Sequence, residues 1–144
     1  MRNTMKYLLG FCLAFCFSSV SYAELTVSKG HVRAVPPGQK VSVAYMTLTN
    51  NTASDIVLSG AQSPDFMSVN LHRTANIDGI MTMRAQDELR IEPSQSITLA
   101  PGGLHWMLMG LKGELKITDQ VPITLIFADG SQQQLSLVVK ALVN

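Results

Sequence analysis

The feature that most constrains this chain is the regular spacing of its turn-forming residues. Turn signals recur about every ten residues, and the segments between them alternate apolar and polar side chains with no convincing helical period. The clearest turn is Asp78-Gly79, a strong hairpin signal. The pattern predicts an all-β domain, either a sandwich or a barrel. The expected strands lie at 24–35, 40–50, 55–62, 67–74, 80–85, 88–93, 96–101, 104–111, 121–129 and 132–142.

The first 23 residues differ in kind from the rest. A short basic start is followed by an apolar run of eleven residues and then by small residues ending at Ala23. This order is typical of a secretory signal peptide, with a retained N-terminal anchor as the alternative. A lipoprotein signal requires a small residue before its cysteine, whereas Phe15 precedes Cys16. We therefore expect a cleaved signal peptide at 1–23, one exported domain at 24–144, and no stable membrane insertion after cleavage.

The cysteines and charges exclude several classes of function. Cleavage after Ala23 would remove both Cys12 and Cys16, so the exported chain would contain no thiolate ligand and no cysteine nucleophile. A blue-copper electron carrier is excluded, because that site requires a Cys thiolate. Loss of two basic residues with the signal leaves nine basic and ten acidic residues, net −1, with no basic run. This distribution argues against nucleic acid as a partner.

Four side chains between residues 72 and 107 suggest a metal site: His72, Met83, His105 and Met107. Thioether sulfur is a soft, neutral donor that suits Cu(I), and imidazole suits several first-row metals. A donor set with neither thiolate nor carboxylate favours copper over zinc, calcium or magnesium. His105 and Met107 are two positions apart, so on a strand they project from one face while Trp106 points to the other.

Each of these residues also has a structural explanation. A lone His is usually a surface or hydrogen-bonded residue, and the six methionines of the exported chain could all fill gaps in the core. His31 lies outside the spaced set, and we expect it to be structural. Met81 and Met109 are expected to pack, with a role as alternative sulfur ligands left open. Arg73 and Arg84 each follow a proposed ligand and are either solvated charges or contacts with a partner protein.

The spacing of the four residues resembles that of the periplasmic PCu(A)C copper chaperones: His, ten residues, Met, twenty-one residues, His-x-Met. The surrounding segments AYMTLTN, DGIMTM and APGGLHWMLMGL also resemble the family, and the likeness covers nearly the whole exported chain. One departure is Arg73, which stands where family members often have Met, at a position that is not needed as a ligand.

This resemblance implies a cupredoxin-like Greek-key β-barrel in the periplasm. It further implies an exposed Cu(I) site formed by His72, Met83, His105 and Met107. The copper would pass to an acceptor during cytochrome c oxidase assembly, either an oxidase subunit or one of its assembly factors. We expect a monomer, and no enzyme, because the chain shows no nucleophile motif and no carboxylate site for a metal-bound water. The competing hypotheses are a metal-free β-sandwich interaction or assembly module and a general periplasmic copper buffer.

Overall fold

The computed structural model describes residues 25–141, so the expected signal peptide at 1–23 lies outside the described residues. Within the described part, every regular element is a strand. No helix between residues 25 and 141 has the length and apolar composition needed to cross a membrane. The strands are β1 Leu25–Arg33, β2 Val41–Asn50, β3 Ile56–Gln62, β4 Phe66–Ile77, β5 Ile80–Ala85, β6 Leu89–Ile91, β7 Ser96–Leu99, β8 Leu104–Leu111, β9 Gln120–Phe127 and β10 Gln132–Lys140.

Seven of the strands close into a barrel. They follow one another in the order β4, β8, β2, β1, β10, β9 and β3, and β3 then pairs back onto β4 at Ala61 and Val69. β1 and β10 are parallel, and the other neighbouring strands of the barrel are antiparallel. The remaining three strands extend the sheet: β5 pairs with β4, β6 with β3 and β7 with β2. The predicted all-β barrel is therefore confirmed.

The barrel interior is filled by alternate residues of each strand, as the period of two requires. On β8, Leu104, Trp106 and Leu108 are buried, and Trp106 is only 1% exposed. Three buried apolar residues of β9, Val121, Ile123 and Leu125, follow the same alternation. The expectation that Trp106 points into the core is confirmed, and His105, Met107 and Met109 consequently lie on the other side of the β8 strand, the outer side of the barrel wall.

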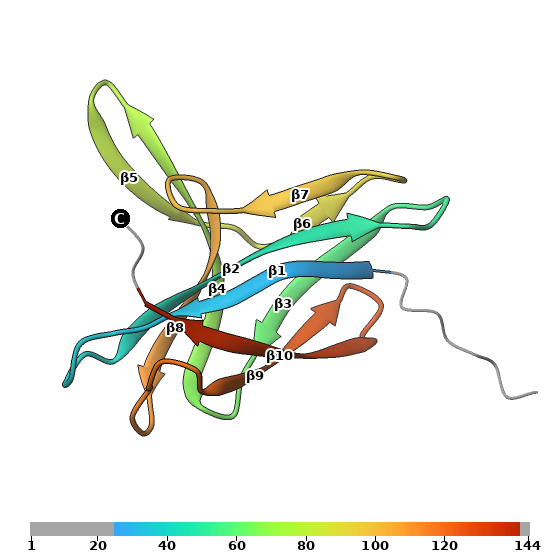
Figure 1. Ribbon diagram of the computed structural model, residues 1–144. Coiled ribbons are helices and arrows are strands. Elements are labelled where there is room, and N and C mark those ends of the chain that lie inside the picture. The colour runs from blue at the N-terminus through green and yellow to red at the C-terminus, as the bar shows by residue number, and fades with distance from the viewer. Residues whose placement is uncertain (1–24, 142–144) are drawn as a thin grey trace, which may run out of the picture.

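The β4–β5 hairpin extends beyond the barrel. Figure 1 shows it rising away from the other strands, and five of the six residues of β5 are exposed. Its turn is Asp78-Gly79, where both residues have positive φ angles of 53° and 80°. Two central residues with positive φ match the right-handed twist of the flanking strands, which explains the predicted hairpin at this dipeptide. The hairpin is held to the barrel only through β4, so β5 is an edge strand.

Gly110 is the glycine most tightly constrained by its surroundings. It lies on β8 opposite Met67, between the pairs Phe66–Leu111 and Ser68–Met109. Its φ angle is +72°, and a Cβ placed on it would approach the Cβ and Cγ of Met67 to 2.7 Å. Both the backbone conformation and the lack of space therefore require glycine here.

We expect Gly110→Ala to lower the free energy of unfolding by about 1–3 kcal/mol, because alanine must adopt a left-handed conformation and displace Met67. Chemical denaturation of the two proteins measures the difference. The matched control is Gly113→Ala, since a Cβ at Gly113 meets no atom within 4 Å and no positive φ is involved. Equal losses of stability in both variants would contradict this account of Gly110.

Candidate metal centre

His72 and His105 lie directly opposite each other on neighbouring strands. They are register partners on β4 and β8, and their ring centroids are 6.0 Å apart at an interplanar angle of 66°. Residues directly opposite in an antiparallel pair project from the same face of the sheet. A metal ion about 2 Å from a ring nitrogen lies roughly 3 Å from the ring centroid, so both rings are within reach of one shared ion.

One nitrogen of each ring is buried without a hydrogen-bond partner. Nδ1 of His105 lies 3.1 Å from the carbonyl oxygen of Gly103. Because a carbonyl only accepts, this bond places the proton on Nδ1 and leaves a lone pair on Nε2. Nε2 of His105 and Nδ1 of His72 are both buried and unpaired. An unpaired buried polar atom costs roughly 1–3 kcal/mol, which a bound metal ion would offset.

The two proposed thioether ligands lie on the same side of the sheet as the imidazoles. Met107 is two residues from His105 on β8 and is partly buried. Met83 on β5 pairs with Thr74, which places it diagonally across from His72, and it is 54% exposed. Diagonal neighbours in a sheet are roughly 7–8 Å apart, a distance that a long side chain such as Met can span. The structure thus brings all four predicted residues to one face of the sheet formed by β8, β4 and β5.

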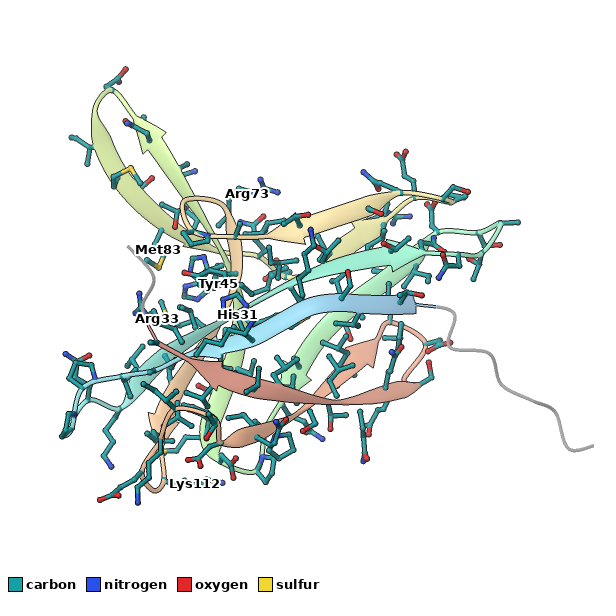
Figure 2. All side chains as sticks on the ribbon, in the orientation of Figure 1. His31, Arg33, Tyr45, Arg73, Met83 and Lys112 are labelled. Atoms are coloured by element: carbon teal, nitrogen blue, oxygen red, sulfur yellow. The ribbon has the colours of Figure 1, made fainter. Side chains whose placement is uncertain are left out.

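We call this outer side of β1, β2, β8 and β4 the metal face; it carries His31, Tyr45, His72, His105 and Met107. Neither His31 nor Tyr45 was predicted to be there. The two are register partners on β1 and β2, with ring centroids 5.6 Å apart. The register of β2 and β8, with Ala44 opposite Trp106 in the core, places Tyr45 on the same outer side as His105. Figure 2 shows His31, Tyr45 and Arg33 below Met83 on this side of the molecule.

Other sulfur atoms also lie on the outer side of these strands. Met81 is 61% exposed and pairs with Asn76, one step further toward the tip of the hairpin than Met83. Met109 is partly buried between Ser68 of β4 and Val41 of β2. The expectation that both simply pack is wrong for Met81, because it stands on a hairpin face exposed to solvent.

The donor set around the two imidazoles contains no acid. Among residues 25–141, no group of three or more His, Cys, Asp or Glu side chains could hold a metal ion. An ion held between His72 and His105 must therefore draw its other ligands from thioether sulfur, water or a partner. A neutral set of imidazole and thioether donors suits a soft ion of low charge.

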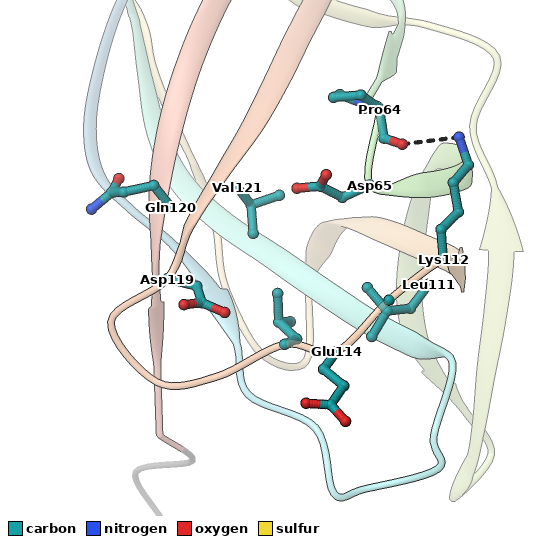
Figure 3. Close-up of a pocket in the computed structure, with 10 residues that line it drawn as sticks. Pro64, Asp65, Leu111, Lys112, Glu114, Asp119, Gln120 and Val121 are labelled. Carbon is teal, nitrogen blue, oxygen red and sulfur yellow. Dashed lines mark hydrogen bonds between the residues drawn. The ribbon is translucent and has the colours of Figure 1, made fainter.

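A hollow at the end of β8 away from His105 has different chemistry. It has a volume of about 260 Å³ and lies beside the β8–β9 loop, with Asp65, Glu114 and Asp119 among its lining residues. Lys112 closes one side, where its Nζ donates a hydrogen bond to the carbonyl oxygen of Pro64 at 2.9 Å (Figure 3). The backbone N–H of Lys116 donates to Asp119 Oδ2 at 2.8 Å, so this carboxylate already holds the loop. The hollow contains neither His nor Met among its lining residues, and it offers no donor set like that of the metal face.

Residues 25–139 match the family model described as "Putative lipoprotein LpqE-like". A relative from Leifsonia xyli subsp. xyli, "Putative lipoprotein Lxx21020", is 36% identical over 115 residues, which are 79% of this chain and 68% of that protein.

Three similar solved structures, of two proteins, share the fold. The solution structure of apo-DR1885 from Deinococcus radiodurans has a TM-score of 0.67 and 34% identity, covering 99% of this chain and 98% of that one. The same protein solved as CuI-DR1885 has a TM-score of 0.63 and 34% identity, and the match covers 85% of this chain and 81% of that chain. The copper-bound PCuAC domain from PmoF2 has a TM-score of 0.69 and 24% identity, and the match covers 83% of this chain and 94% of that chain.

These matches confirm the resemblance inferred from the His and Met spacing. The family model covers most of the chain, and the structural neighbours include PCuAC domains with the same barrel. The chain belongs to the LpqE-like family and has the fold of the PCuAC domains.

Proposed function

We propose that this chain is an exported copper chaperone that binds one Cu(I) ion through His72, Met83, His105 and Met107. The observation that carries the proposal is the direct pairing of His72 with His105, each with a buried nitrogen that has no hydrogen-bond partner. Two methionines at matching positions on the same face supply soft donors beside these nitrogens. The structural neighbours CuI-DR1885 and the copper-bound PmoF2 domain support copper as the metal.

The neutral ligands favour Cu(I) over Cu(II). Two imidazoles and two thioethers leave the charge of the site equal to that of the ion, so Cu(II) would bring a second positive charge without compensation. Thioether sulfur also prefers the softer, monovalent ion. Copper is the cargo in this proposal, and the protein performs no bond-making chemistry on a substrate.

The different exposure of the ligands suits transfer of the ion. His105 is 4% exposed and is held by its bond to Gly103, so it forms the fixed side of the site. Met83 is 54% exposed and stands on an edge strand that meets the barrel through β4 alone. An incoming ligand from an acceptor would replace Met83 first, with the imidazoles holding the ion until the exchange is complete. Ligand exchange of this kind requires no release of free copper.

The sequence and the relatives support a proposal for the cellular setting. A relative that carries the word lipoprotein in its name supports export of this chain, and the expected signal peptide at 1–23 would deliver it to the periplasm. We propose that the acceptor belongs to the copper-site assembly of cytochrome c oxidase, as the resemblance to PCu(A)C chaperones implies. The protein would act as a monomer.

Competition with a coloured Cu(I) chelator under reducing, anaerobic conditions tests the site. Residues 24–144 should bind one equivalent of Cu(I). His105→Ala and Met83→Leu should each weaken Cu(I) binding by at least about tenfold, because replacing even a residue that only hydrogen-bonds to a metal ligand lowers metal affinity by about 10–100-fold. Met83 is exposed, so its replacement by Leu removes the sulfur while leaving the fold intact.

Two variants outside the proposed ligand set serve as matched controls. His31→Ala removes a partly buried imidazole beside Tyr45, and Met67→Leu removes a thioether that is 80% exposed. Both should bind Cu(I) as the wild type does. Failure of the wild type to compete with the chelator would overturn the proposal and leave a metal-free interaction module.

Acidification should release the copper. A protonated imidazole nitrogen cannot ligate, so lowering the pH from about 7 to about 4 should progressively weaken Cu(I) binding. The same chelator competition, repeated across this range, measures the effect. A flat profile would show that the imidazoles are not ligands. The Met83→Leu variant should keep the pH dependence of the wild type at lower affinity, because the lost ligand does not titrate.

A further inference from the structure

The outer half of the β4–β5 hairpin carries two methionines on a single face. Met83 is the register partner of Thr74, and Met81 is the register partner of Asn76. Positions 72, 74 and 76 alternate along β4, so both pairs share the face of the hairpin on which His72 lies. Met81 is therefore one step farther from His72 than Met83, in the direction of the hairpin tip.

Packing does not account for Met81. Its side chain is 61% exposed and that of Met83 is 54% exposed, whereas a methionine that fills a gap in a core is buried. The residues opposite them are the short polar side chains Thr74 and Asn76, and Asn76 is itself exposed. Both thioether side chains are consequently open to solvent.

The two strands of the hairpin carry no carboxylate. Neither Asp nor Glu occurs in Phe66–Ile77 or in Ile80–Ala85. Arg73 and Arg84 are register partners on the opposite face of the hairpin, so their charges do not lie between the two methionines. A pair of neutral sulfur donors without a carboxylate favours Cu(I) over harder, divalent ions.

The spacing of Met81 and Met83 allows both to reach one ion. Alternate residues of a strand are roughly 7 Å apart. Methionine is unbranched and flexible, so two thioethers that project from such positions can converge on an ion between them. Met107 and Met109 have the same spacing on β8, but both are partly buried, which makes them less accessible to copper that arrives from outside.

We propose that Met81 and Met83 form a capture site, at which Cu(I) binds first before it reaches the imidazoles. This inference rests on the proposed function, since it gives the route by which copper enters the same site. During entry the Cu–S bond to Met83 persists, the bond to Met81 breaks, and the other three ligands of the proposed site take its place. The ion stays Cu(I) throughout, so the step needs no electron donor or acceptor.

A capture site would speed loading because the imidazoles are hard to reach directly. His105 is 4% exposed, so few encounters with a copper carrier present the ion to its ring. The two exposed thioethers stand on an edge hairpin that rises away from the barrel (Figure 1), where ligand exchange with a carrier is unobstructed. Once Met83 holds the ion, binding by the imidazoles becomes an intramolecular event with a high effective concentration.

Loading kinetics test the capture site. Cu(I) is supplied as its coloured chelator complex under reducing, anaerobic conditions, and the loss of colour is followed in time. The Met81→Leu variant of residues 24–144 should load about tenfold more slowly than the wild type, because the intramolecular route is lost. Its Cu(I) affinity at equilibrium should be unchanged, since Met81 is not a ligand in the loaded site. A wild-type loading rate in this variant would overturn the proposal.

Two double variants separate the position of the sulfur from the number of sulfurs. Met81→Leu with Asn76→Met returns a thioether to the same face, directly across the hairpin, and should restore fast loading. Met81→Leu with Ile80→Met returns it to the opposite face and should load as slowly as Met81→Leu, because successive residues of a strand alternate. Equal loading rates in the two double variants would contradict the capture site.

NMR of isotope-labelled methionine methyl groups adds a readout that does not depend on the loading rate. In a His72→Gln variant, which weakens the imidazole site, substoichiometric Cu(I) should shift the methyl resonances of both Met81 and Met83. The resonance of Met67, which is 80% exposed elsewhere on β4, should stay in place. An unmoved Met81 resonance would overturn the capture site alone, whereas failure of the wild type to bind Cu(I) would overturn the proposed function itself.

Discussion

The register between β4 and β8 is the constraint on which the metal face depends. His72 is placed opposite His105 only because Leu71 and Trp106 are partners on the other side of the same two strands, buried in the barrel. The side-chain period of a strand is two, so a slip of one residue would turn Trp106 outward and His105 into the core. Burial of one large indole thereby holds the two imidazoles together, and the energy of the core is what positions the site.

Rigidity decreases across the site from β8 to β5. His105 belongs to a barrel strand paired on both sides, by β2 and β4, and its ring is anchored to Gly103. Met83 belongs to a six-residue edge strand with little buried surface. Few buried contacts mean a low free energy for local opening. The proposed site would therefore combine a nitrogen donor held in place at His105 with a sulfur donor at Met83 that can move away, an arrangement that suits ligand exchange.

The strands and turns could be predicted closely because their signals are local. β5 and β8 begin and end as predicted, and the hairpin at Asp78-Gly79 follows from two residues that tolerate positive φ. The pairing of His72 with His105 could not be derived, since it joins strands more than thirty residues apart and depends on how the whole barrel closes. The same limit explains why His31 was assigned to a structural role. Its position on the metal face requires the pairings of β1 with β2 and of β2 with β8, which local patterns do not encode.

The absence of acid from the strands within residues 25–141 bears on the choice of metal. A carboxylate near the imidazoles would stabilise a divalent ion and would remove the softness of the proposed site. Because Asp and Glu are confined to loops within residues 25–141, the strands that carry His72 and His105 offer no carboxylate beside these imidazoles. In the proposed site, this pattern of side chains would favour Cu(I) over Cu(II), because the charge of a divalent ion would not be compensated.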